Sequence, residues 1–313
     1  MTSVKINREK QYQGVTRVLV DIDSGIPGPL ILAVGGIHGN ELAGIIAIHQ
    51  VADRLENHNI QIKGRFLGLT GNINAVRERQ RYIDKDLNRI FPRSRSKCIT
   101  YCGAVSEVNE LDEFIQLIDD NVEADQEVFY VDCHTTSSET APYLSVNEYD
   151  KSIELADGFP LATVVGLQKV LPGCCAEYLN LRGFHGFTAE GGQHDDFASI
   201  ENLEAIIWMM FCHTGAVDRK TGSECFPHHY QLLSKNIIEG KKKFELIYHY
   251  RIAENEQFSM KPGYINFQRI EKGEWLASNQ HSKIHSPYDC RILMPLYQEQ
   301  GDDGFFLLQE NIS

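Results

Sequence analysis

The chain contains 313 residues, has the composition of an ordinary soluble globular protein and carries a net charge of −13 at pH 7. This length provides a substantial core and predicts one large domain or two unequal domains. The acidic charge argues against a nucleic-acid partner, because phosphate binding requires a basic face. The sequence has no apolar run long enough to span a membrane and no apolar core near its N-terminus, so we expect no membrane partner and a cytoplasmic location.

Eight cysteines are scattered along the chain, and a chain of this length does not depend on disulfide bonds. The spacing of Cys98 and Cys102 and the adjacent pair Cys174 and Cys175 would also fit metal or redox sites. We interpret all eight as reduced, structural thiols. They lie at positions 98, 102, 133, 174, 175, 212, 225 and 290.

The first part of the chain predicts an α/β fold. Residues 15–22 alternate weakly and indicate an edge strand, and the apolar residues 30–34 indicate a short buried strand. A helical pattern follows over residues 41–55, and residues 61–70 predict another strand. This order is typical of a largely parallel sheet, so we expect a mixed, largely parallel sheet flanked by helices.

The turn at residues 35–41 joins the buried strand to the first helix and contains His38 and Glu41. With two residues between them, the imidazole and the carboxylate can point into one space and share a metal ion. Open α/β sheets bind ligands at this end of their strands. The pair alone is weak support, since a surface histidine and a helix-capping glutamate produce the same pattern.

A third residue strengthens the prediction of a metal site. The pattern of residues 127–133 predicts a strand, and His134 lies at its end. Two histidines and one carboxylate are the protein ligands of a hydrolytic zinc site, whose fourth position is left for water. We therefore predict one zinc ion bound by His38, Glu41 and His134. The hydroxyl residues 135–138 lack the Gly-x-Ser-x-Gly elbow of a serine nucleophile, so we interpret them as a turn near the ligands.

Residues 72–95 are unusually polar for a segment between strands and contain six arginines. A solvated basic loop would explain this composition. However, the segment leaves the same edge of the sheet as the His38 turn, so some of the guanidinium groups can face the site. Arginine is suited to bidentate recognition of a carboxylate. An amphipathic helix is then predicted over residues 106–121, with Ser106 as its N-cap.

Further strand-like runs cover residues 162–167 and 184–189, and the second run ends at Glu190. Because this strand belongs to the same sheet, we predict that Glu190 does not bind the metal and acts as the general base. His194 and Asp195 could also bind the metal, but three ligands are already assigned, so we do not include these two residues. Residues 199–212 predict a buried helix that closes the first domain.

The sequence changes character from about residue 225. Strand-like segments alternate with turns rich in Gly, Pro, Asn and Asp, which predicts a small all-β C-terminal domain. We therefore divide the chain into an α/β domain, residues 1–220, and a β-rich domain, residues 221–313.

Four blocks in this order resemble the aspartoacylase/succinylglutamate desuccinylase family of the zinc carboxypeptidase superfamily. They are Gly-Gly-Ile-His-Gly-Asn-Glu at 35–41, Arg-Tyr-Ile-Asp-Lys-Asp-Leu-Asn-Arg-Ile-Phe at 81–91, Val-Asp-Cys-His-Thr-Thr at 131–136 and Ala-Glu-Gly-Gly at 189–192. The resemblance implies a zinc-carboxypeptidase-like fold with a C-terminal β-domain that partly roofs the substrate channel.

The resemblance also implies roles for six residues besides the metal ligands and Glu190. Arg81 would polarise the scissile carbonyl, and Asn88 and Arg89 would hold a substrate carboxylate. Tyr178 and Arg182 are four residues apart, and this spacing alone favours a pair of an aromatic residue and a cation on the surface. The resemblance implies instead that both residues take part in binding an acidic substrate. Tyr297 would reach over to the substrate, although a tyrosine in the core of the β-domain is an equal alternative.

The function implied is zinc-dependent hydrolysis of the amide bond of a small anionic N-acyl amino acid, releasing a carboxylate and a free amino acid. A zinc carboxypeptidase acting on peptides would use the same chemistry, but a roofing domain favours a small substrate. The other alternative is a non-catalytic binding protein of the same fold. The presence of the right residue type at each expected catalytic position argues against it. The sequence leaves open which acyl group and amino acid are used and whether the protein is a homo-oligomer.

Overall fold

The computed structural model describes residues 14–93, 105–123, 125–218, 220–221, 228–235, 238 and 242–311. Four residues interpreted from the sequence, Arg95, Cys98, Cys102 and Cys225, lie outside these ranges. The cysteines inside them are free thiols, as predicted: Cys133, Cys174, Cys175, Cys212 and Cys290. No described helix is long and apolar enough to cross a membrane.

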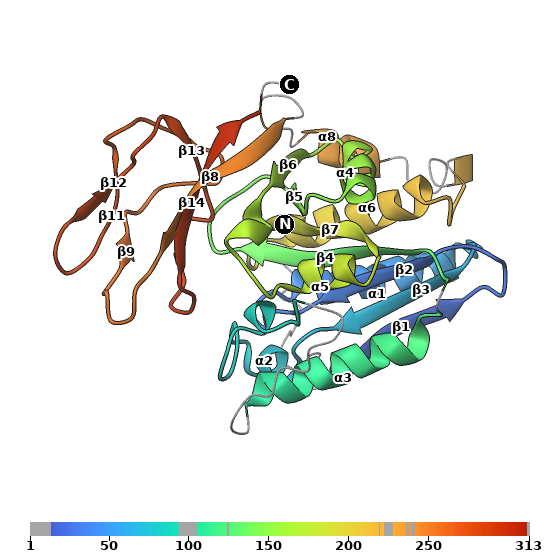
Figure 1. The fold of residues 1–313 in the computed structure, drawn as a ribbon. Coiled ribbons are helices and arrows are strands. Elements are labelled where there is room, and N and C mark those ends of the chain that lie inside the picture. Colours follow the sequence, from blue (N-terminus) through green and yellow to red (C-terminus); the bar gives the residue numbers. More distant parts are fainter. Residues whose placement is uncertain are drawn as a thin grey trace, which may run out of the picture.

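One sheet of eleven strands, counted over the described residues, organises the molecule in the order β1-β3-β2-β4-β7-β5-β6-β8-β14-β13-β10 (Figure 1). The strands β3, β2, β4 and β7 pair in parallel, and β1 is an antiparallel edge strand, as predicted. The first seven strands are β1 (Val18–Asp23), β2 (Leu30–Gly35), β3 (Arg65–Thr70), β4 (Val128–Thr136), β5 (Tyr143–Val146), β6 (Ala162–Val165) and β7 (His185–Gln193).

Helices cover both faces of the parallel strands, which explains why β2 is apolar at nearly every position. Ile31 and Ala33 point to the face covered by α1 (Ala43–Asn57) and α6 (Phe197–His213). The alternate residues, including Leu30 and Leu32, point to the face covered by α3 (Ser106–Asn121) and α5 (Cys175–Leu181). The shorter helices are α2 (Ile73–Glu78), η1 (Leu87–Arg89), α4 (Asp150–Asp157), η2 (Leu167–Lys169) and α8 (His229–Lys235).

The C-terminal part is rich in strands, as expected, and it both extends the main sheet and forms a second, smaller one. β8 (Lys243–Arg251) pairs in parallel with β6, and β14 (Asp303–Glu310), β13 (Cys290–Leu293) and β10 (Arg269–Ile270) follow. A second sheet contains β12 (Lys283–His285), β11 (Trp275–Ser278) and β9 (Ser259–Met260). Because the main sheet crosses residue 220, the division into two domains stays a prediction.

Three local expectations need correction. Ser106 is the first residue of α3 and not its N-cap, because Val105 holds the N-cap position and the Asp84 carboxylate accepts the Ser106 N–H at 2.8 Å. His134 and Glu190 lie inside β4 and β7, which continue to Thr136 and Gln193.

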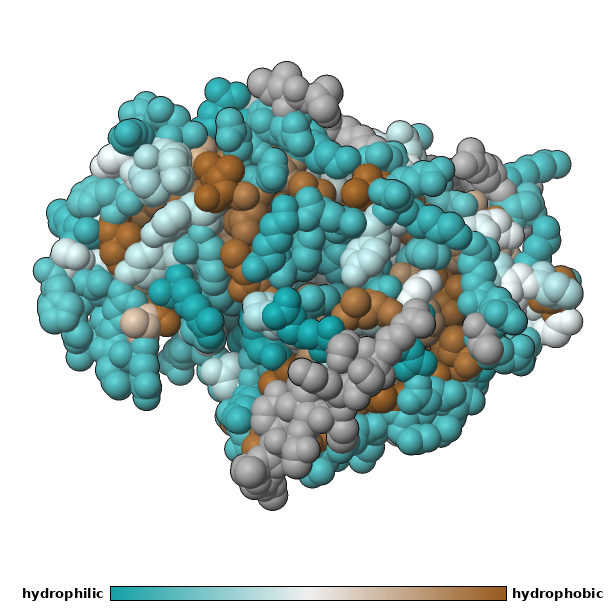
Figure 2. Space-filling model, in the orientation of Figure 1, coloured by the Kyte–Doolittle hydropathy of each residue, from teal (hydrophilic) through white to brown (hydrophobic). Residues whose placement is uncertain are grey.

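The face of the molecule shown in Figure 2 is mostly hydrophilic, with hydrophobic residues in small patches between polar ones.

Phe244 on β8 tests whether the two parts of the chain are stabilised together. The side chain is fully buried and packs in one cluster with Tyr143, Val164 and Phe306. We expect Phe244→Ala to lower the free energy of unfolding by about 3–5 kcal/mol, measured by chemical denaturation, within a single transition. In the control, Phe197→Ala, the lost side chain is 53% exposed and the change should stay within about 0.5 kcal/mol. Two separate transitions, with only one shifted, would contradict a shared core.

Candidate active site

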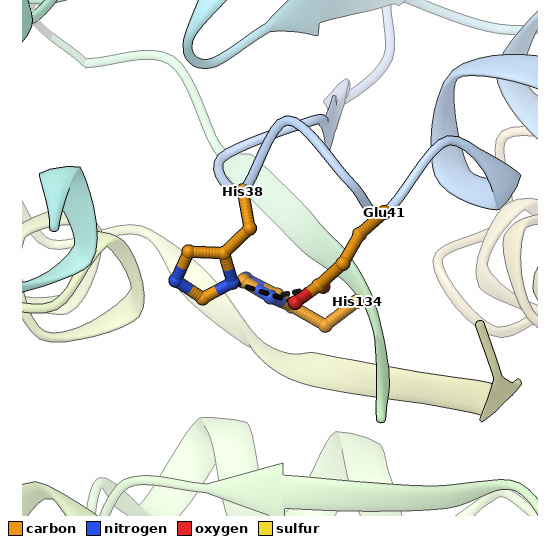
Figure 3. A group of neighbouring side chains, drawn as sticks. All are labelled: His38, Glu41 and His134. Carbon is orange, nitrogen blue, oxygen red and sulfur yellow. Dashed lines mark hydrogen bonds and ion pairs between the residues drawn. The ribbon is translucent and has the colours of Figure 1, made fainter. Parts of the chain in front are cut away.

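Three side chains converge at the carboxyl ends of β2 and β4, and together they form the metal-binding group predicted from the sequence (Figure 3). One ligand atom from each of His38, Glu41 and His134 lies within 4.8 Å of the others. The Glu41 carboxylate lies 2.7 Å from Nδ1 of His38 and 2.9 Å from Nδ1 of His134. All three side chains are buried. Both histidines therefore offer Nδ1 to a shared ion.

The turn before α1 holds His38 and Glu41 in this position. Gly35 at the end of β2 lies opposite Cys133 of β4, so the turn begins beside the residue that precedes His134. Gly39 must be a glycine, because a Cβ atom there would lie 2.0 Å from the Ala75 carbonyl carbon. Close packing against α2 thus fixes the backbone between the two ligands.

A buried aspartate contacts the second ring nitrogen of each histidine. Oδ1 of Asp86 lies 3.1 Å from Nε2 of His38, and Oδ1 of Asp132 lies 3.2 Å from Nε2 of His134. Such carboxylates orient metal-binding histidines and make them more basic. Neither aspartate was assigned a role from the sequence. Asp132 could have been found, since it lies two residues before His134 and points to the same face of the strand.

The electrostatics of this group fit a bound cation. Burial would raise the pKa of Glu41, but the imidazoles of His38 and His134 hold it well below its usual range. Burial would lower the pKa of His134, but the charges of Asp132 and Glu41 raise it well above its usual range. The three ligands thus form an anionic carboxylate and two imidazoles oriented by carboxylates, a donor set that suits zinc.

Glu190 lies beside these ligands. It is paired with His134 in the register of β4 and β7, and its Oε2 atom is buried without a hydrogen-bond partner among the described residues. Burial, reinforced by the charges of Glu41 and Asp132, raises the pKa of Glu190 to about 8. A buried carboxylate with a raised pKa next to a metal site is suited to accept and return a proton.

The arginines predicted from the 72–95 segment line the same pocket, which has a volume of about 930 Å³ including space open to solvent. Arg81 contacts Asp86 at 2.9 Å and lies 3.6 Å from Glu41. Arg89 forms an ion pair with Asp303 of β14 at 2.5 Å. Asn88 also lines the pocket, and its Oδ1 atom accepts the Cys175 N–H at 2.8 Å.

Tyr178, Arg182 and Tyr297 do not line this pocket. Arg182 turns away because it pairs with Asp119 of α3 at 2.5 Å and donates to the Tyr178 hydroxyl at 2.8 Å. The ring of Tyr178 packs against Phe91 instead, with 5.6 Å between centroids. Their expected contact with a substrate is therefore not supported.

Tyr297 is held by the segment between β9 and β10. Its hydroxyl accepts the Tyr264 N–H at 2.8 Å and donates to the Lys261 carbonyl at 3.0 Å. This position also differs from the alternative, a tyrosine in the core of the β-domain, because Tyr297 is 38% exposed.

The loop 294–302 between β13 and β14 closes the site with residues that the sequence did not reveal. Gln298 accepts from the Asn40 amide at 3.0 Å and lies 3.2 Å from Nε2 of His194. Gln300 accepts the Arg81 N–H at 2.9 Å and donates to the Tyr82 carbonyl at 3.1 Å. Neutral amides carry no chemical signature in a sequence, so only the contacts identify them. His194 lines the pocket but does not belong to the metal-binding group found among the described residues.

A buried glutamate on α3 fixes the segment between Arg81 and Asp86. The Glu107 carboxylate accepts the N–H groups of Ile83, Asp84 and Lys85 at 2.7, 3.1 and 3.1 Å. It also accepts from the Asn72 amide at 3.1 Å. The helix was predicted only to cover the sheet, yet it also positions the residues that contact His38 and line the pocket.

We expect Glu107→Ala to lower the free energy of unfolding by at least about 3 kcal/mol, because three backbone N–H groups lose their acceptor. Zinc affinity should fall about tenfold or more, since Asp86 loses its position beside His38. Chemical denaturation and competition with a zinc chelator measure the two effects. Glu107→Gln, which keeps one acceptor oxygen and the same shape, should lose less of both. Unchanged stability and zinc affinity in Glu107→Ala would contradict this role.

The sequence is similar to those of known proteins over most of its length. The model of the succinylglutamate desuccinylase/aspartoacylase catalytic domain matches residues 27–199, more than half of the chain. The chain is 24% identical over 282 residues to succinylglutamate desuccinylase of Pseudomonas paraeruginosa, covering 85% of this chain and 80% of the relative. It is also 24% identical over 274 residues to N-acyl-aromatic-L-amino acid amidohydrolase (carboxylate-forming) of Xenopus tropicalis, covering 82% of this chain and 86% of the relative.

The fold is similar to that of solved structures. The crystal structure of succinylglutamate desuccinylase/aspartoacylase from Rhodobacter sphaeroides superposes with a TM-score of 0.64 at 18% identity, covering 92% of this chain and 87% of that chain. The matched region of the family model contains His38, Glu41, His134 and Glu190. The protein therefore belongs to the succinylglutamate desuccinylase/aspartoacylase family.

Proposed function

We propose that the protein is a zinc-dependent hydrolase that cleaves the amide bond of an N-acyl amino acid and releases a carboxylate and a free amino acid. The observation that carries the proposal is the position of Glu190, whose Oε2 atom has no hydrogen-bond partner among the described residues and lies beside the metal-binding group in a pocket that also contains Arg81 and Arg89. The relatives support the same class, since they are named as a desuccinylase and an amidohydrolase. A cytoplasmic location remains part of the proposal.

Zinc, held by His38, Glu41 and His134, would supply a water of lowered pKa and polarise the substrate carbonyl. Glu190 takes the proton of the attacking water at its carboxylate and then donates it to the leaving amine nitrogen, which becomes the free amino group. Its raised pKa favours this return of the proton.

Arg81 stabilises the negative charge that develops on the carbonyl oxygen. Its guanidinium is held by Asp86, and Nη1 lies 3.6 Å from the metal ligand Glu41, so the group faces the reacting bond. A donor of this kind contributes on the order of 3 kcal/mol to the transition state. Asn88 and Arg89 hold the carboxylate of the amino acid, since both residues line the same pocket and both carry N–H donors.

The loop 294–302 favours a small substrate over a peptide. It contacts the turn that carries the ligands through Gln298 and the Arg81 segment through Gln300, and it lines part of the pocket, so it limits the space beside the metal-binding group. This contact pattern makes peptide hydrolysis by a carboxypeptidase the less suitable function.

The proposed activity is tested by measuring amine release from a panel of N-acetyl and N-succinyl amino acids, with one peptide carrying a free C-terminus. We expect turnover of at least one acyl amino acid, loss of that turnover after removal of zinc with a chelator, and recovery when zinc is added. Turnover of the peptide alone would favour a carboxypeptidase. Absence of all turnover by the zinc-loaded protein would contradict the proposed hydrolysis.

Glu190→Gln separates proton transfer from metal binding. The amide cannot accept the proton of the attacking water, so we expect kcat to fall about 100- to 10,000-fold. Zinc content, measured by elemental analysis, should stay at one ion per chain because Glu190 is not a ligand. A variant that retains activity within a few-fold of the unaltered protein would show that another group acts as the base.

A further inference from the structure

We propose that the substrate carries a single carboxylate, so that both its amino-acid side chain and its acyl group are uncharged. This inference rests on the function proposed above and concerns the charge that the pocket can accommodate. It separates this protein from an enzyme for acetylated or succinylated acidic amino acids, whose substrates carry two or three carboxylates.

The pocket contains few cations, and each already has an acidic partner. Arg81 and Arg89 are the arginines that line it, and no lysine lines it, among the residues that the structure describes. Arg81 is paired with Asp86, and Arg89 with Asp303. Arg182, the next candidate for binding a second carboxylate, contacts Asp119 outside the pocket. Arg89 and Asn88 form the one subsite to which we assign a substrate carboxylate, which would share the Arg89 guanidinium with Asp303.

A carboxylate of the protein lies beside that subsite. Asp303 lines the pocket and is held between Arg89 and His249, which lies 2.8 Å from its second oxygen. Burial would raise the pKa of Asp303, but His249 and Arg89 lower it to about 2, so the group is charged at neutral pH. A first carboxylate at Arg89 would gain the attraction of the guanidinium, whereas a second one would find no further cation there and would be repelled by Asp303.

The wall that extends from Glu190 across the sheet has no charged side chain among its described residues. Thr188 of β7 lies opposite Ser145 of β5, and Leu167 and Leu171 follow on and after η2. Phe306 of β14 completes this wall. A carboxylate buried against these groups would lose its hydration without gaining a cation, whereas an amide, hydroxyl or apolar group would be accommodated.

Matched substrate pairs test this inference because their members differ almost only in charge. N-acetyl-L-glutamine is compared with N-acetyl-L-glutamate, N-acetyl-L-asparagine with N-acetyl-L-aspartate, and N-butanoyl-L-glutamine with N-succinyl-L-glutamine. With the zinc-loaded protein we expect kcat/KM to be at least about tenfold higher for the uncharged member of each pair. Equal or higher values for the acidic members would overturn the inference.

A variant places a cation in the uncharged wall. Leu171 is half-buried and lines the pocket, so Leu171→Arg should shift the ratio of kcat/KM towards N-acetyl-L-glutamate by about tenfold or more. Leu171→Gln is the matched control, because it adds a polar side chain without a charge and should leave the ratio nearly unchanged. A shift of the same size in both variants would contradict a role of charge.

Binding distinguishes failure of this inference from failure of the proposed hydrolysis. The same pairs are titrated into zinc-loaded Glu190→Gln protein by calorimetry, which requires no turnover. Tighter binding of the uncharged members without turnover by the unaltered protein would support the charge selectivity and overturn the hydrolysis. Tighter binding of the acidic members would overturn the selectivity whatever the activity, and absence of both binding and turnover would overturn both proposals.

Discussion

The buried carboxylate of Glu41 is the interaction on which the rest of the site depends. Its side chain is 3% exposed and contacts Nδ1 of both histidines, and it accepts the Thr135 N–H at 3.0 Å. A buried charge is unfavourable by several kcal/mol unless it is paired and hydrogen-bonded. The turn after β2 and the end of β4 must therefore be held together before this charge is stable, and a divalent cation stabilises it further. The sheet provides that constraint through the parallel pairing of β2 with β4.

The sequence was sufficient to predict the metal ligands and the general base, because their positions follow from the order of strands and helices along the chain. Residues that end neighbouring parallel strands meet at one edge of a sheet, so His38, Glu41, His134 and Glu190 could be brought together without coordinates. The strands of the first part except β5 and the helices α1, α3 and α6 were also recognisable, because an apolar strand buried on both faces and an amphipathic helix have distinct periods. These predictions depend only on local patterns and on one rule of topology.

The remainder depends on packing between distant segments, which local patterns do not contain. The spacing of Arg182 to Tyr178 does not show whether Arg182 points into the pocket, because its direction is set by Asp119 on another helix. Tyr297 was chosen from the loop that does close the site, but its neighbour Gln298 makes the contact with Asn40. Asp303 and Glu107 were missed for the same reason, since a carboxylate acquires its role from partners that lie far along the chain.

The main sheet continues from β6 into β8 and β14, so residues from the end of the chain reach the same pocket as the predicted metal ligands. Every predicted metal ligand and the predicted base lie between residues 38 and 190, whereas Asp303, Phe306 and the loop 294–302 come more than a hundred residues later. The chemistry is thus encoded in the first part of the chain, whereas the pocket wall is shared between that part and the last strands. Substitutions near the end of the chain can change which molecules fit without moving a single ligand of the metal, so related enzymes with the same reaction and different substrates can arise from changes confined to β14 and the loop before it.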